Sequence, residues 1–227
     1  TSITNMSVYI FLQETPYIDF STSIVRDQSK ALFKGVKSEL EKVRIAFEFV
    51  RDEISHSFDV NATVVTAKAS DVLKHKTGIS HAKANLLAAL LRSQKIPAGM
   101  CYQHLTRNKD NDSEGHIVYC FNAVHIGNRW IKLDARGNNS RVDVRFSMHE
   151  PALAFANRPQ YKEFFWPGIF ARPHRASMNA LESATSMEEL LKKLPDHMLE
   201  DPDIVEVEAE DFRAETHNSR AGSGSWF

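Results

Sequence analysis

The stretch at residues 71–99, DVLKHKTGISHAKANLLAALLRSQKIPAG, constrains the fold of this chain more than any other. Apolar residues recur there at three- and four-residue steps from about Ser80 to Ser93, which predicts a buried helix. Ser80 falls at the helix N-terminus, where free backbone N–H groups and the positive end of the helix dipole favour an anion. A nucleophile would be well placed at this position. The alternative is that Ser80 is only an N-cap, a role in which serine is strongly preferred.

The N-terminal part of the chain predicts two helices that cover a common core. We assign them to residues 20–36 and 38–54, with a strand or extended arm before them at residues 7–14 and a loop after them at residues 59–69. Their inward-facing side chains are predicted from their spacing. These are Ile24, Ala31, Leu32 and Val36 in the first helix, and Leu40, Val43, Phe47, Val50 and Ile54 in the second.

Three β-rich runs follow the central helix, at residues 98–105, 117–126 and 129–136. The second and third are joined by Gly127-Asn128, a two-residue connection that suits a tight hairpin turn. Together with the helices, these runs predict an α+β fold in which N-terminal helices and a central helix pack on an antiparallel sheet.

Several motifs together resemble the bacterial transglutaminase-like superfamily, whose fold is related to that of papain-like cysteine peptidases. They are FEFVRDEISHSFD at residues 47–59, then G-x-S-x3-A-x-LLAALLR followed by IPAG, and finally the W-x-x-x-D pattern of Trp130 and Asp134. The resemblance extends over about residues 47–138. It implies a papain/transglutaminase-like core and a Cys-His-Asp catalytic triad.

The sequence departs from the family pattern at two of the three triad positions. Ser80 stands where the family has its nucleophilic cysteine, whereas Asp134 fits the aspartate position. The family histidine opens a pattern like H-x-x-[NE]-A-V, which here begins at Tyr119. The nearest histidine, His116, lies three residues earlier, and an odd offset on a strand points it to the opposite face.

The resemblance implies hydrolysis or transfer at an amide bond of a peptide or protein through an acyl-enzyme. Ser80 would be the nucleophile, His116 or Tyr119 the base, and Asp134 the group that orients the base. The oxyanion donors would be the Ser80 N–H and an upstream side chain, for which Gln13 is a candidate. Three explanations stay open: a catalytically inactive peptide- or protein-binding module, a deliberately substituted form of a working cysteine enzyme, and a serine hydrolase.

Composition and spacing argue against other classes of function. A formal net charge of −1 over 227 residues gives no electrostatic footprint for nucleic acid, and no run of 18 apolar residues suggests a membrane span. The chain contains no Gly-rich phosphate loop and no acidic calcium loop. His75 and His81, with His104 or His116, match no metal-ligand spacing. We therefore expect no cofactor and no metal.

The two cysteines, Cys101 and Cys120, are expected to be reduced and partly buried, which favours a cytoplasmic location. A bridge is possible only if their strands are neighbours, and neither is expected to replace the nucleophile, because each lies inside a strand.

We expect one domain over residues 1–196, with its core at about residues 36–140. Near its end, Ser186 and Glu189 form a capping-box signature. The acidic segment 197–227 is expected to be flexible.

Overall fold

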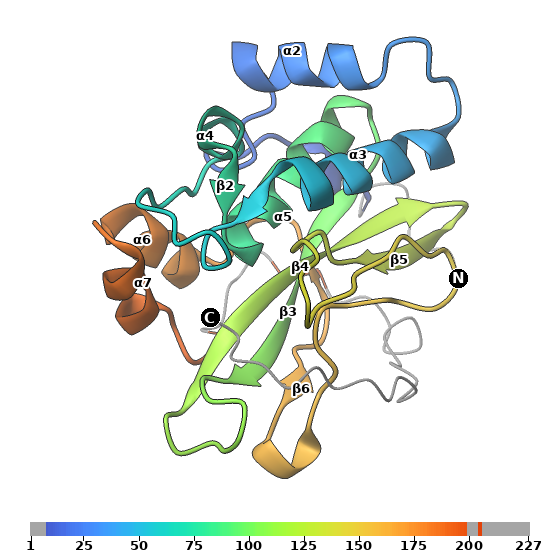
Figure 1. Ribbon diagram of the computed structural model, residues 1–227. Helices are drawn as coiled ribbons and strands as arrows, with labels where there is room; N and C mark the ends of the chain where they lie inside the picture. Colours follow the sequence, from blue (N-terminus) through green and yellow to red (C-terminus); the bar gives the residue numbers. More distant parts are fainter. Residues whose placement is uncertain (1–7, 199–203, 206–227) are drawn as a thin grey trace.

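The computed structural model describes residues 8–198 and 204–205. Its centre is an antiparallel sheet in the order β5-β4-β3-β7-β8, in which β6 also pairs with β3 (Figure 1). The predicted α+β fold with an antiparallel sheet is confirmed. The strands are β3 (Ala98–Thr106), β4 (His116–Ile126), β5 (Arg129–Leu133), β6 (Phe164–Phe165), β7 (Ile169–Phe170) and β8 (Ile204–Val205).

Helix α5 (Ser80–Ser93) has the bounds predicted from the sequence and lies between the sheet and the N-terminal helices (Figure 1). Every residue from Ser80 to Arg92 is buried, because the helix packs on β3 and β4 on one side and on α2, α3 and α4 on the other. A helix enclosed in this way is apolar on several faces rather than along one stripe.

The helix α3 (Glu39–Glu53) follows the prediction, with Val43, Phe47 and Val50 in the core and Ser38 as its N-cap, although Leu40 is exposed. The inward face predicted for α2 (Ser23–Leu32) was only partly correct, because Leu32 packs against the core but Ala31 is exposed. Ile24 is exposed, whereas Val25 and Ser29 are buried.

The error has a polar cause. The Ser29 hydroxyl lies 2.7 Å from the Ser93 hydroxyl at the end of α5. A hydrogen-bonded serine therefore faces the core. Because this serine is polar, the spacing of apolar residues alone does not show which side of α2 is buried.

The predicted strand or arm at residues 7–14 was also wrong, because this segment forms the short 3-10 helix η1 (Ile10–Leu12). The Phe11 ring packs edge-to-face on Trp130 with centroids 4.8 Å apart. A Cβ on Gly99 would lie 2.9 Å from Phe11 and 2.3 Å from Ile169, so only glycine allows this close approach. Side-chain contacts, rather than strand pairing, hold the segment in place.

A short parallel ladder leads into α5. Strand β1 (Ser55–His56) pairs with β2 (Thr77–Gly78), which places His56 opposite Gly78. Helix α4 (Ala69–His75) connects the two strands and ends at Lys76, whose φ of 56° turns the chain back. The pairing brings β1, which lies before α4 in the chain, close to the N-terminus of α5.

The C-terminal part contains η2 (Pro159–Tyr161), α6 (Arg175–Ser183) and α7 (Met187–Lys193). The Ser186 hydroxyl accepts the Glu189 N–H at 3.1 Å, as the capping-box signature predicted. The Val118 N–H donates to the Pro195 carbonyl at 3.0 Å, which holds the end of α7 over the start of β4. Of the segment 197–227, only residues 197–198 and 204–205 are described, and Ile204–Val205 extends the sheet as β8.

Cys101 and Cys120 are both buried and free. Their strands β3 and β4 are neighbours, but Cys101 pairs with Phe121 and Tyr102 pairs with Cys120. Because adjacent positions on a strand face opposite sides, the two sulfur atoms lie on opposite faces of the sheet. This register excludes the bridge that the sequence left open. No helix among the described residues is long and apolar enough to cross a membrane.

Candidate active site

Ser80 is the first residue of α5 and is 6% exposed. Ile79 precedes it as the N-cap residue, and no side chain caps this helix end. The first backbone bond of the helix runs from the Lys83 N–H to the Ile79 carbonyl at 3.0 Å. The N–H groups of the first turn thus have no helical acceptor, and they give Ser80 the electropositive setting that the sequence predicted.

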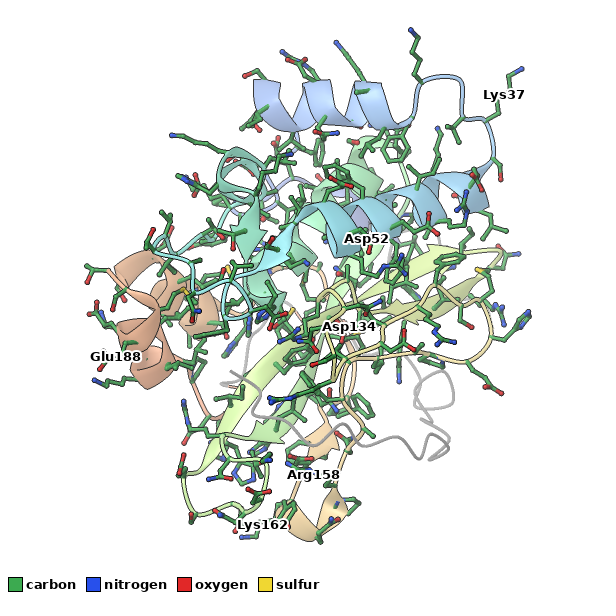
Figure 2. The ribbon with its side chains drawn as sticks, viewed as in Figure 1. Lys37, Asp52, Asp134, Arg158, Lys162 and Glu188 are labelled. Carbon is green, nitrogen blue, oxygen red and sulfur yellow. The ribbon has the colours of Figure 1, made fainter. Side chains whose placement is uncertain are left out.

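Tyr119, which the sequence pattern predicted at the position of the family histidine, binds Asp134 directly. Its hydroxyl donates to both carboxylate oxygens, at 3.1 and 3.0 Å. Asp134 follows β5 and also accepts the N–H of Arg136 at 3.1 Å and the N–H of Ala154 at 2.9 Å. Asp134 lies near the middle of the molecule, whereas Arg158 and Lys162 lie at the far end of the β6 region (Figure 2).

The charges of this pair are set by burial. Burial and the nearby Asp134 carboxylate raise the pKa of Tyr119 well above its ordinary value of 10.0. Burial also raises the pKa of Asp134, although hydrogen bonds from Ala154, Tyr119 and Arg136 oppose that rise. The Tyr119 hydroxyl consequently keeps its proton at neutral pH and acts as a donor.

His116 does not reach this pair. Its Nε2 lies 2.8 Å from the Tyr161 carbonyl, and its ring packs against His104 with centroids 4.2 Å apart. The positions 116 and 119 on β4 face opposite sides of the sheet, as the period of two requires. The structure therefore brings Tyr119 and Asp134 together and leaves His116 apart from them.

Ser80 and Tyr119 line one small pocket. The space open to the centre of a water molecule is about 20 Å³, enough for about one water. Phe155 and Leu194 contribute apolar walls. The full lining is His56, Phe58, Ile79, Ser80, His81, Ile117, Val118, Tyr119, Arg136, Phe155 and Leu194.

Sequence reasoning missed the pocket residues His56 and Arg136. Arg136 donates through both terminal nitrogens to Asp59, at 2.9 and 3.0 Å. His56 Nδ1 lies 4.0 Å from the same carboxylate. The only signal in the sequence was their nearness to matched motifs, FEFVRDEISHSFD for His56 and the W-x-x-x-D aspartate for Arg136.

The buried Lys83, one turn after Ser80, connects the segments around the pocket. Its ammonium donates to the Ile54 carbonyl at 2.5 Å and to the Arg136 carbonyl at 2.6 Å. Burial lowers the pKa of Lys83 to about 7. This side chain holds the end of α3 and the segment after β5 against α5.

Gln13, the candidate oxyanion donor, does not line the pocket; its side-chain amide lies 3.4 Å from the Tyr9 carbonyl. The histidines considered for a metal are also dispersed, since His81 lines the pocket while His104 packs against His116. Among the described residues, no group of three or more metal-ligating side chains is assembled.

Acid should destabilise the fold through His81, which is 2% exposed and whose two ring nitrogens have no hydrogen-bond partner among the described residues. Burial, aided by repulsion from His174, lowers the pKa of His81 from 6.5 to about 3. As the pH falls, His81 therefore takes up a proton in the unfolded chain before it does so in the folded protein. The free energy of unfolding is highest above pH 6.5 and decreases as the pH falls toward 3. Between pH 7 and pH 5 the loss is about 2 kcal/mol for this one group.

The check is urea unfolding at pH 7 and pH 5 in piperazine buffer, which carries no carboxylate. The wild-type protein should lose about 2 kcal/mol more than His81→Phe, in which His56 and His104 still titrate. An equal loss in both proteins would show that His81 is accessible to protons in the folded state.

A central helix that begins at Ser80, packed on an antiparallel sheet that carries Tyr119 and Asp134, defines an α+β protein of papain/transglutaminase-like architecture. Residues 26–135 match the model of the transglutaminase-like superfamily. The resemblance to this superfamily that the sequence predicted is thus confirmed over residues 26–135. No curated protein matches the chain.

Three solved structures are similar to the chain at low identity. A candidate cysteine protease from Cytophaga hutchinsonii is 18% identical, with a TM-score of 0.48 over 59% of this chain and 43% of its own. A candidate protease from Parabacteroides distasonis is 17% identical, with a TM-score of 0.36 over 55% and 25%. A TGase is 11% identical, with a TM-score of 0.39 over 65% and 37%. The chain spans less than half of each.

Proposed function

We propose that this chain is a transglutaminase-like module that has lost acyl-transfer catalysis and binds a peptide or protein segment at the former active site. The observation that carries the proposal is the hydrogen bond from the Tyr119 hydroxyl to Asp134. A family triad needs an imidazole that takes a proton from the nucleophile while the aspartate orients it. Here the aspartate is bound to a phenol that keeps its proton.

The competing function is a serine hydrolase that uses another histidine as its base. His116 is engaged by the Tyr161 carbonyl. His56 and His81 line the pocket and are neutral, because burial lowers the pKa of each. However, within the described part of the chain the Ser80 hydroxyl has no hydrogen bond to either ring. A serine hydroxyl without a hydrogen-bonded base is a weak nucleophile.

Two departures from the triad, at Ser80 and at Tyr119, favour natural loss of catalysis over deliberate substitution. Exchange of cysteine for serine alone would suit a substituted enzyme, since it removes only the thiolate. We also propose a cytoplasmic location, because the buried free thiols of Cys101 and Cys120 suit a reducing compartment.

The test compares the wild-type chain with Ser80→Ala on a mixed panel of peptide amides and amines. We expect both proteins to release ammonia or transfer acyl groups at the same background rate, while immobilised peptides retain the wild-type protein. Wild-type activity that Ser80→Ala abolishes would establish a serine enzyme and overturn the proposal. The retention arm tests binding separately: a peptide panel that retains none of the protein would contradict it.

A further inference from the structure

We propose that the Ser80 pocket binds a carboxylate group, supplied by the end of a peptide chain or by a small free acid. The pocket would thus recognise an anion where the family builds an acyl-enzyme. The peptide source rests on the proposed function, whereas the small-acid source does not.

The first observation is the end of α5. This helix has 14 residues, so its dipole is fully developed, and no side chain caps its N-terminus. The residues of its first turn, Ser80 and His81, line the pocket. Backbone N–H groups that lack helical acceptors at such a position are well suited to bind carboxylate oxygens.

The second observation is independent of the helix end. Arg136 is 3% exposed and lines the pocket, and its Nε has no hydrogen-bond partner among the described residues. His81, at 2% exposed, likewise has two ring nitrogens without partners in the described part of the chain. Buried polar groups are normally hydrogen-bonded, so the Arg136 Nε–H and the single N–H of the neutral His81 ring, in two residues that line the pocket, indicate a missing acceptor.

The acidic side chains near the pocket already have hydrogen-bond partners. Asp59 accepts both terminal nitrogens of Arg136 and the side-chain amide of Asn139. Asp134 accepts the Tyr119 hydroxyl and two backbone N–H groups. Neither carboxylate accepts a hydrogen bond from the Arg136 Nε or from the first-turn N–H groups of α5. These N–H groups are therefore available to a ligand.

The size of the pocket selects the class of ligand. A space of about 20 Å³ holds about one water, so it admits an oxygen of a carboxylate but not an amino-acid side chain. Phe155 and Leu194 form apolar walls that would contact the carbon next to the carboxylate. The geometry therefore suits the terminal carboxylate of a chain, with the remainder of the ligand outside.

The test is a titration of the full chain with sodium acetate, followed by the backbone amide signals of Ser80 and His81 in proton–nitrogen NMR spectra. Acetamide, which is neutral and has the same shape, is the matched control, and sodium chloride keeps the ionic strength constant. We expect acetate to shift both signals saturably and to bind at least tenfold more tightly than acetamide. No saturable shift, or an equal shift with acetamide, would overturn the inference.

A second measurement needs no ligand. Ser80→Asp would place a carboxylate at the end of α5 inside the pocket, and Ser80→Asn would place a neutral group of the same shape there. We expect the midpoint of thermal unfolding of Ser80→Asp to exceed that of Ser80→Asn by about 2 °C or more. A lower midpoint for Ser80→Asp would contradict the inference.

Peptides separate the inference from the proposed function. The same peptides are prepared with a free C-terminal carboxylate and with a C-terminal amide. Preference for the free carboxylate supports both the carboxylate site and the peptide-binding function. Equal binding of the two forms supports the peptide-binding function but overturns the carboxylate site. Acetate binding without any peptide binding supports a small-acid site and contradicts the peptide-binding function.

Discussion

The double variant Ser80→Cys/Tyr119→His should acquire acyl-transfer activity at least 100-fold above that of Ser80→Cys alone. A positioned general base contributes about 10²- to 10⁴-fold to a rate, and the imidazole at position 119 would supply it. Position 119 already points its side chain at Asp134 and lines the pocket with Ser80. The aspartate would then orient an imidazole instead of accepting a phenol.

The thiol is needed as well as the base. A cysteine at position 80 would lie at the uncapped end of α5, where the helix dipole lowers the pKa of a thiol and raises the thiolate fraction. In Ser80→Cys alone, no imidazole lies between this thiolate and Asp134. We therefore expect weak activity in that variant and no gain in Tyr119→His alone.

The activity is measured as ammonia release and amine incorporation on the same peptide panel, and alkylation of the thiol introduced at position 80 should abolish it. The control Ser80→Cys/His116→Ala should behave like Ser80→Cys, because His116 is bound to Tyr161. A double variant no more active than Ser80→Cys, with an unchanged fold, would show that the former catalytic geometry is no longer present. A loss caused by His116→Ala would show that His116 reaches the pocket.

Short-range patterns predicted the scaffold that carries the site. The periodicity of α5 and the Gly127-Asn128 turn depend on neighbouring residues, so the sequence placed both correctly. The turn residues have φ of 59° and 61°, the conformation that this pair favours. The alternation of β4 also separated His116 from Tyr119. These features depend only on local geometry.

Long-range contacts were beyond the reach of the sequence. His56 reaches the pocket only because β1 pairs with β2 across 22 residues, from Ser55 to Thr77. Arg136 lines it because Asp59, far away in the chain, fixes its guanidinium. The prediction of a strand or arm around Phe11 was wrong for the same reason, since the Phe11 ring packs on Trp130, which is distant in sequence. Such contacts form no periodic pattern.

Arg92 illustrates how much such contacts contribute to stability. It is 0% exposed, and no carboxylate neutralises it in the described part of the chain. Its guanidinium donates to the Gln13 carbonyl at 2.6 Å, to the Ala98 carbonyl at 3.0 and 2.7 Å, and to the Ala171 carbonyl at 2.7 Å. One side chain thus joins η1, the start of β3 and the segment after β7 to the end of α5.

Replacement of Arg92 by Met should lower the free energy of unfolding by about 3 to 5 kcal/mol. Met fills a similar volume, so little cavity forms, but carbonyl groups on three separate segments lose a charged donor. Each buried carbonyl left without a partner costs about 1 to 3 kcal/mol, and the relief from removing a buried charge offsets part of that sum. Arg92→Lys should also be destabilising, since one ammonium cannot reproduce the planar fork of donors.

Urea unfolding at pH 7 measures this change, with Arg26→Met on the exposed face of α2 as the matched control. We expect the control to stay within about 0.5 kcal/mol of the wild-type protein, as surface substitutions usually do. The separation of η1 from the sheet would be seen as faster hydrogen exchange around Phe11 in Arg92→Met. Equal stability of the two variants would mean that water replaces the guanidinium and that these segments are held by apolar packing alone.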